Sequence, residues 1–162
     1  MPLMAEGEFA LGRGYLERAL EKTAHWTGDH DLYAMLADTA VRQRDEAALR
    51  KYAPLAEELA IRHGHGLYQA VAHRTWGVAH RLAGEYAEAH ARLNQALGLF
   101  TGLGTRWQMG RTHFELAELA QAQNDPAEAQ AQFAHALAAF EAMGAQPDVA
   151  RTQARLQEVG TM

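Results

Sequence analysis

Few side chains in this sequence could carry catalytic or metal chemistry. The chain contains neither cysteine nor serine, which excludes thiol and serine nucleophiles, disulfides, and cysteine-based zinc and iron–sulfur sites. Nine histidines remain, and the closest pair is His63 and His65, in a segment expected to form a loop. No carboxylate lies beside that pair, whereas a metal site needs three or four converging ligands. We therefore expect a protein that is not an enzyme and that has no metal site and no cofactor.

Arginine is the residue type that could bind a ligand. Between Glu58 and Glu115 the only acidic residues are two glutamates in the segment 85–88, while arginines and histidines recur throughout. Arg74 and Arg81 are seven residues apart, which places them on one face of a helix. Guanidinium groups on one face suit carboxylates or phosphates. An anion site is one hypothesis, and pairing of these arginines with acids of the same chain is the other.

Composition indicates an all-α protein without a nucleic-acid or membrane partner. The chain has 34 alanines and 19 leucines but only six isoleucines and valines, which favours helices over strands. A net charge of −5 provides no overall basic field for a phosphate backbone. The longest stretch without a charged residue, 93–105, is shorter than the roughly 20 residues that span a bilayer. Glu6 and Glu8 stand where a secretory signal would be basic and then apolar, so a cytoplasmic location is expected.

A forty-residue repeat organises the sequence. The segment GEYAEA at 84–89 recurs as NDPAEA at 124–129. Gly64, Gly104 and Gly144 fall at the same interval. Self-similarity at a fixed period of this length is typical of stacked supersecondary units.

Each unit is predicted to contain two antiparallel helices. The first helices cover about 30–43, 67–82 and 106–122, and the second helices run to the periodic glycines. Pro54 lies inside one second helix, where we expect a kink or a loosened interface. The whole chain, 1–162, is thus expected to form one domain of about eight helices. Its parts are a half repeat at 7–28 that opens with a turn at 7–9, repeats at about 29–65, 66–105 and 106–145, and a terminal helix at about 147–159.

The pattern resembles the tetratricopeptide repeat (TPR) family over essentially the whole chain. Trp76-Gly77, Gly84-Glu85-Tyr86, Ala89 and Ala96 match the family's large-small pair, its turn and its two alanines. Small residues in those places lie where neighbouring helices cross closely. The forty-residue period is similar to the longer variant found in bacterial regulatory proteins. The resemblance implies a right-handed α-solenoid whose first helices face a concave groove.

The repeat register provides candidate residues for binding a partner in that groove. They are Asp38, Arg74, Val78, Arg81, Arg111, Phe114 and Glu118. The family's chaperone-tail receptors hold a terminal carboxylate with asparagine and lysine. Asp38, Val78 and Glu118 occupy the asparagine positions here, so that clamp is absent.

Residues outside the groove also have expected places in the fold. The initial half unit would leave an apolar stripe of Phe9, Leu16 and Leu20 uncovered. Self-association into a homodimer, a missing part of a longer protein, or folding back of residues 2–4 could cover it. His73 and His113 are expected against neighbouring helices near the groove, where protonation would add positive charge. Trp76 is assigned to the core, whereas Trp107 is left open between core and groove.

These observations predict a non-catalytic scaffold or adaptor that binds a polypeptide segment in its concave groove. Such a module would belong to a bacterial regulatory protein, and its partner could be acidic. The alternative is a sensor that binds a small anionic ligand or a signalling peptide near Arg74, Arg81 and Arg111.

Overall fold

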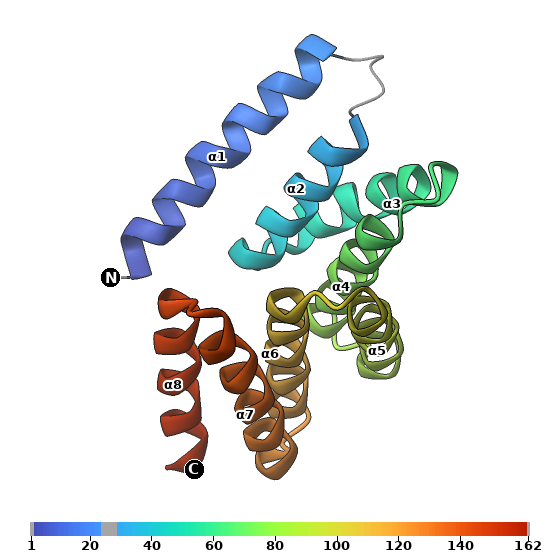
Figure 1. Cartoon of the computed structure of the whole chain (residues 1–162). Coiled ribbons are helices and arrows are strands. Elements are labelled where there is room, and N and C mark those ends of the chain that lie inside the picture. Colours follow the sequence, from blue (N-terminus) through green and yellow to red (C-terminus); the bar gives the residue numbers. More distant parts are fainter. Residues whose placement is uncertain (1, 24–28, 162) are drawn as a thin grey trace.

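The computed structural model describes residues 2–23 and 29–161. Within that part, side chains at 2–8, 20, 22, 23, 29 and 30 are not described. The described residues form α-helices joined by short turns (Figure 1). The helices are α1 (Pro2–Thr23), α2 (Asp29–Gln43), α3 (Glu46–Arg62), α4 (Gly66–Leu82), α5 (Tyr86–Leu103), α6 (Arg106–Ala122), α7 (Pro126–Met143) and α8 (Gln146–Gly160).

The helix bounds follow the forty-residue repeat, which confirms that each unit contains two helices. α2, α4 and α6 start within one residue of the predicted positions and end where predicted. Asp45 and Asp125 cap the next helices, because each carboxylate accepts the backbone N–H three residues later, at 3.1 and 3.0 Å. α5 and α7 end at Gly104 and Gly144, with φ of 69° and 65°. Glycine adopts this left-handed conformation without a steric penalty.

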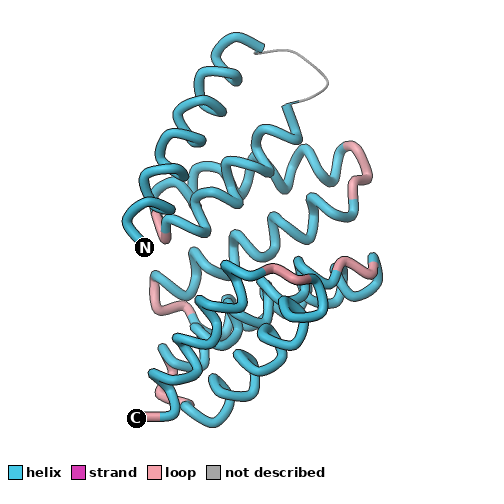
Figure 2. The backbone as a smooth tube through the Cα atoms, turned by 60° about the vertical axis from the view of Figure 1, so that its left-hand side comes forward, coloured by secondary structure: helices cyan, strands magenta, loops and turns pink. Residues whose placement is uncertain are grey.

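The helices stack into an all-α solenoid in which α2, α4, α6 and α8 are the inner helices and α1, α3, α5 and α7 the outer helices (Figures 1 and 2). Consecutive helices pack against each other along the stack. In addition, α2 contacts α4 and α4 contacts α6, whereas no comparable contact joins α3, α5 and α7. Like helices approach one another only on the inside of a curved stack, so the inner helices line its concave face.

Glycines allow the helices of one repeat to approach closely. A Cβ atom added at Gly77 would lie 2.6 Å from Cγ of Leu93, and one at Gly110 would lie 2.9 Å from Cε1 of Phe140. The expectation that Gly77 marks a close helix crossing is confirmed. Its neighbour Trp76 packs, half-buried, against the buried core of the first repeats.

The turn predicted at residues 7–9 is wrong. α1 is one helix from Pro2 to Thr23, so Pro2 begins a helix and the residues after it do not fold back over α1. Proline is favourable in the first turn of a helix, and a glycine inside a helix costs only about 1 kcal/mol.

Pro54, where a kink or a loosened interface was expected, does not end its helix. α3 continues through it from Glu46 to Arg62, and the ring of Pro54 is exposed.

Polar contacts attach α1 to the first repeat. Arg13 Nη1 donates to Oδ2 of Asp45 at 2.8 Å, and the hydroxyl of Tyr52 donates to Oε1 of Glu17 at 2.7 Å. Leu16 packs beside them against the core shared by α2 and α3. The outer end of the stack is therefore joined to the next helices by both apolar and ionic contacts.

The apolar stripe expected on α1 is partly covered by the chain itself. Leu16 lies in the core contact, and Phe9 is half-buried beneath the guanidinium of Arg42, 5.3 Å from the ring centroid. The side chain of Leu20 lies outside the described residues. The large apolar side chains that α1 exposes are Leu11 and Tyr15, at 66% and 67%.

His73 and His113 lie between an inner helix and the outer helix that follows it. The Nδ1 atom of His73 is 2.9 Å from Arg92 on α5. His113 contacts Gln132 on α7 at 2.7 Å and stacks on His135. Burial lowers the pKa of His73, as does the charge of Arg92. Burial also lowers the pKa of His113, against the opposing effect of the contact with Gln132.

Replacing Gly77 with alanine should reduce the free energy of unfolding by about 1 to 3 kcal/mol, because Leu93 must move. Gly98→Ala on α5 is the matched control, since nothing lies within 4 Å of its added Cβ. In that variant the free energy of unfolding should increase by about 0.5 to 1 kcal/mol, because alanine has a higher helix propensity than glycine. Urea denaturation of both variants measures the difference. An unchanged or increased stability in Gly77→Ala would contradict the helix crossing described here.

Acidification should destabilise the fold through His73 and His113. Both pKa values are lowered on folding, so the unfolded chain binds more protons below the ordinary histidine pKa of about 6.5. The free energy of unfolding should therefore fall between about pH 7.5 and about pH 5.5. In the double variant His73→Gln, His113→Gln this decline should be smaller, as measured by urea denaturation at each pH. The exposed His90→Gln controls for the substitution itself, and an equal decline in the double variant would contradict the assignment.

Candidate functional site on the concave face

The candidate groove residues lie on the inner helices, and nearly all are buried. Arg74, Val78, Arg81, Arg111, Phe114 and Glu118 are each at most 9% exposed. The side chain of Asp38 is 28% exposed. The forty-residue register thus gathers these residues along the inside of the solenoid. There they contact one another across repeats, and little of their surface reaches solvent.

Asp38 on α2 binds two guanidinium groups from later repeats. Its Oδ1 accepts from Arg74 Nη2 on α4 at 3.0 Å, and Arg111 Nη1 on α6 donates to the same carboxylate at 2.7 Å. Burial by itself would raise the pKa of Asp38. Attraction to Arg111 and Arg74 outweighs burial and holds that pKa well below its ordinary range. The carboxylate is therefore ionised at neutral pH, and each of its oxygens accepts from one guanidinium group.

Arg74 is fully buried at the centre of the solenoid. Besides Asp38 it donates to the carbonyl of Gln108 at 3.3 Å and to the hydroxyl of Thr112 at 3.5 Å. Its guanidinium lies over the ring of Phe100, 5.0 Å from the centroid. Burial and the repulsion of Arg111 lower its pKa to about 9, so Arg74 still carries its charge at neutral pH.

A second ionic cluster lies about two helical turns further along the inner helices. Arg81 on α4 pairs with Glu115 at 3.2 Å and with Glu118 at 3.8 Å. Glu118 also accepts from Arg155 on α8 at 2.9 Å and from Arg44 at 3.4 Å. The cluster therefore joins the C-terminal end of α2 with α4, α6 and α8.

These contacts show that the central arginines pair with acids of the same chain, as one of the two hypotheses expected. Arg74, Arg81 and Arg111 each form ion pairs with carboxylates of the same chain. They are structural residues that hold successive inner helices together. A ligand near them would have to displace buried intramolecular pairs, which is costly because a buried charge is then left without a partner.

The sequence did not single out two arginines and an aspartate that the structure places beside this network. Arg42 on α2 lies 5.7 Å from the ring centroid of Trp107, and Arg111 lies 5.0 Å from the same ring. The indole Nε1 of Trp107 donates to Asp148 on α8 at 2.9 Å. Trp107 is half-buried: it packs against the core that contains Phe114 and also contacts Arg42 and Arg111 on the inner helices. Arg151 on α8 could have been found from the register, because it stands forty residues after Arg111.

The described residues contain no group of three or more histidines, cysteines or carboxylates that could hold a metal ion. In the loop that contains the histidine pair 63 and 65, the ring of His65 stacks on the ring of Tyr68, with 4.1 Å between their centroids. None of the helices, over their described residues, is long and apolar enough to cross a bilayer.

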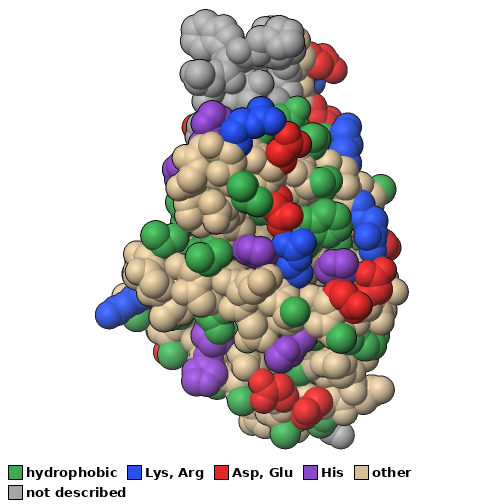
Figure 3. All heavy atoms as spheres, turned by 90° about the vertical axis from the view of Figure 1, so that its right-hand side faces the viewer, with side chains coloured by type: hydrophobic (Ala, Val, Ile, Leu, Met, Phe, Trp, Pro, Cys, Tyr) green, Lys and Arg blue, Asp and Glu red, His purple; other side chains and the backbone are tan. Residues whose placement is uncertain are grey.

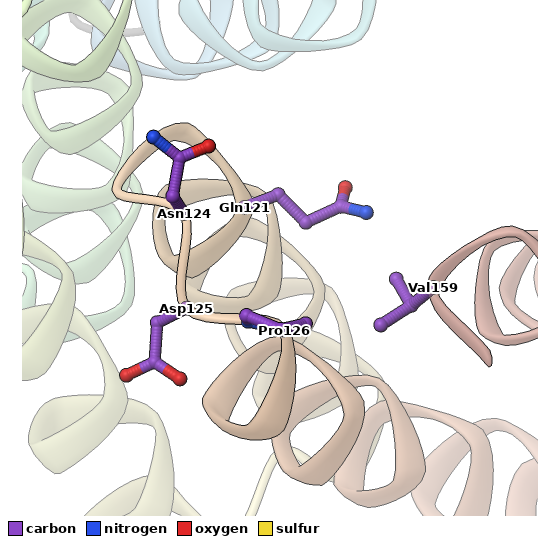
Figure 4. A pocket seen from close by; sticks show the side chains of 5 residues that line it. All are labelled: Gln121, Asn124, Asp125, Pro126 and Val159. Carbon is purple, nitrogen blue, oxygen red and sulfur yellow. The ribbon is translucent and has the colours of Figure 1, made fainter. Parts of the chain in front are cut away.

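A pocket of 220 Å³ lies where the turn between α6 and α7 faces the end of α8 (Figure 4). Its polar side chains have structural partners: Asp125 caps α7, and Gln121 accepts from Arg155. The remaining lining residues are Asn124, Pro126 and Val159. The pocket therefore brings together no set of groups for catalysis.

The outer surface carries charges of both signs. Arg62 pairs with Glu58, and Arg92 pairs with Glu57. On the face that Figure 3 shows, basic and acidic side chains are interspersed and do not gather into a patch of one sign.

Asp38→Asn should strongly destabilise the solenoid, because it leaves Arg74 and Arg111 buried with no carboxylate between them. Removal of one partner from a buried ion pair costs about 3 to 5 kcal/mol of unfolding free energy. The control is Glu58→Gln, whose pair with Arg62 is 63% and 62% exposed and should contribute less than about 1 kcal/mol. Urea denaturation distinguishes the two variants, and equal stabilities would show that the buried network is not a structural centre.

Comparisons with known proteins agree with this architecture. Residues 68–142 match the family model described as tetratricopeptide repeat. The crystal structure of BtubC (BKLC) from P. vanneervenii superimposes with a TM-score of 0.61 at 16% sequence identity, covering 98% of this chain and 75% of that one. At this identity the likeness shows the fold alone. A search of curated proteins found no significant match. The chain is therefore a helical-repeat protein by its fold, and its residues 68–142 match the tetratricopeptide repeat family.

Proposed function

We propose that this chain is a non-catalytic interaction module that binds a polypeptide segment along its concave face. TPR repeats generally mediate protein–protein interaction. The observation that carries the proposal is a group of partly exposed side chains on the inner helices: Arg151 is exposed over the ring of Phe114, and Arg42 lies over the half-buried ring of Trp107. These side chains border the buried ionic network and combine aromatic surface with hydrogen-bond donors, the combination enriched where proteins bind partners.

The rigid setting of this surface supports the proposal. The side chains that border the groove stand on four helices, and Asp38, Glu118 and the arginines bound to them hold those helices together. A binding surface that is already ordered loses less entropy when a partner docks. The same proposal places the module in a regulatory protein of the bacterial cytoplasm. Self-association through Phe9, Leu16 and Leu20 has less support, because Leu16 packs inside its own chain.

The test places a bulky side chain on the concave face without changing the fold. Ala154 on α8 is exposed and stands three residues after Arg151, at the register position of Phe114. Ala134 on the outer helix α7 is also exposed and is the matched control. Peptides selected from a random displayed library against the wild type are labelled, and their Kd is measured by fluorescence anisotropy. Ala154→Trp should weaken binding roughly tenfold or more, since a buried clash at an interface centre costs at least 1.4 kcal/mol.

Ala134→Trp should leave the Kd unchanged. Selected peptides that lose affinity only in Ala134→Trp would place the binding surface on the outer helices and contradict the proposal. Circular dichroism and thermal unfolding of both variants check that the helices remain intact.

A further inference from the structure

One side of α1 has no neighbouring helix within the described part of the chain. α3, α5 and α7 each pack between two inner helices, whereas α1 packs against α2 alone among the inner helices. Figure 1 shows α1 at the edge of the stack. Leu11 and Tyr15 lie on its open side and are 66% and 67% exposed. This side of α1 therefore presents uncovered apolar surface.

The pair of large apolar residues distinguishes α1 from the other outer helices. The forty-residue register gives the equivalents of positions 11 and 15 on each of them. They are Lys51 and Leu55 on α3, Ala91 and Gln95 on α5, and Ala131 and His135 on α7. Adjoining apolar side chains on a surface indicate a contact more than single ones do, and tyrosine is enriched in protein interfaces. The exposed patch on α1 is therefore a candidate interface.

Charged residues of opposite sign stand on either side of this patch. Arg18 follows Tyr15 by three positions, and Glu8 precedes Leu11 by three, so the four residues share one face of α1. Arg18 is exposed, and its guanidinium lies 4.8 Å from the ring centroid of Tyr15. The side chain of Glu8 lies outside the described residues, and its place follows from the helix register alone. The face thus runs from an acidic position through two apolar ones to a basic one.

This order of residues is complementary to itself when two copies of α1 lie antiparallel. A two-fold axis at the level of position 13 places Leu11 opposite Tyr15 of the second copy, because the two are equally far from that position. The same axis places Glu8 opposite Arg18 of the second copy. Each contact then occurs twice, as in every two-fold interface. A parallel pair would instead set Arg18 against Arg18, which is unfavourable.

Gly14 leaves room for a second helix to approach this face. It stands three positions after Leu11 and four before Arg18, on the same side of α1. Among the described residues, a Cβ atom added at Gly14 would meet only the terminal nitrogens of Arg18, at 3.6 and 3.9 Å. At Gly77 and Gly110 a neighbouring helix fills that space. Glycine inside a helix costs about 1 kcal/mol relative to alanine, and the close approach of a second α1 would give Gly14 a packing role.

We propose that α1 pairs antiparallel with α1 of a second copy, so that the chain forms a two-fold symmetric homodimer. The contact buries Leu11 and Tyr15, and two ion pairs between Glu8 and Arg18 fix its register. This side of α1 faces away from α2, so the dimer does not depend on binding to the inner helices. One helix from each copy buries less than the roughly 1,600 Å² of a standard interface, and we expect a dimer that dissociates in the micromolar range.

Charge reversal combined with sedimentation equilibrium tests this arrangement over a range of protein concentrations. Arg18→Glu sets two carboxylates against each other at both ends of the helix pair, and Glu8→Arg sets two guanidinium groups there. Each single variant should raise the Kd of the dimer roughly tenfold or more, because like charges replace opposite ones at two places. The double variant Glu8→Arg, Arg18→Glu should restore the wild-type Kd. An equimolar mixture of the two single variants should form a heterodimer.

Recovery in the double variant and in the mixture separates a broken interface from a damaged fold, and circular dichroism of each variant checks the helices. Leu11→Ala with Tyr15→Ala should also weaken the dimer, because it removes the apolar patch. Arg62→Glu is the control on the outer helix α3, where that arginine is 62% exposed. It makes the same charge change as Arg18→Glu and should leave the Kd of the dimer unchanged.

Three results would overturn the proposal. A wild type that stays monomeric at every concentration would leave this side of α1 to a different partner. A dimer whose Kd is the same in both single variants would be formed by another surface. Folded variants that fail to dimerise in both the double variant and the mixture would contradict the antiparallel register.

Discussion

The Asp38 carboxylate on α2 receives guanidinium groups from both α4 and α6, and the rest of the concave face is arranged around this interaction. A charge buried among inner helices is tolerated only when it is paired and hydrogen-bonded. Arg74 meets this condition with Asp38, Gln108 and Thr112. Because the three partners of the network come from three consecutive repeats, it fixes the relative positions of those repeats and hence the curvature of the solenoid.

Close packing makes such a network possible. With glycine at 77 and 110, the outer helices sit against the inner helices at distances that a Cβ atom would not permit. The curvature then brings α2 near α6 and α8, so that Arg44 reaches Glu118 across 74 residues of sequence. The glycines thus set the spacing within a repeat, and the ion pairs join the inner helices of different repeats.

The same network explains where a ligand can be recognised. Arginines that neutralise buried carboxylates stabilise the fold but have little free hydrogen-bonding capacity. Arg42 and Arg151 lie at the border of the network over aromatic rings, and within the described residues Asp148 attracts both of them without forming an ion pair. In a solenoid the fold itself specifies no ligand, so the choice of a partner depends on partly exposed side chains such as these and not on the buried pairs.

The sequence by itself determined the helices, their period and their pairing. Helix propensity, the acidic caps at Asp45 and Asp125 and the glycines at forty-residue intervals are local features, and each acts within a few residues of its own position. The repeat register also placed Asp38, Arg74, Arg81 and Arg111 on the inner side. The turn expected at 7–9 was wrong because glycine permits a turn without requiring one.

Only the tertiary structure showed which of these arginines form ion pairs with carboxylates of the chain. Ion pairing depends on the distance between side chains from different repeats, and that distance depends on the curvature of the whole stack. Arg111 meets Asp38 from 73 positions away, while Arg151, at the equivalent register position, meets Phe114 and no carboxylate. Equivalent positions in the repeat thus have different partners, because the position forty residues after Asp38 holds Val78, which cannot pair with an arginine.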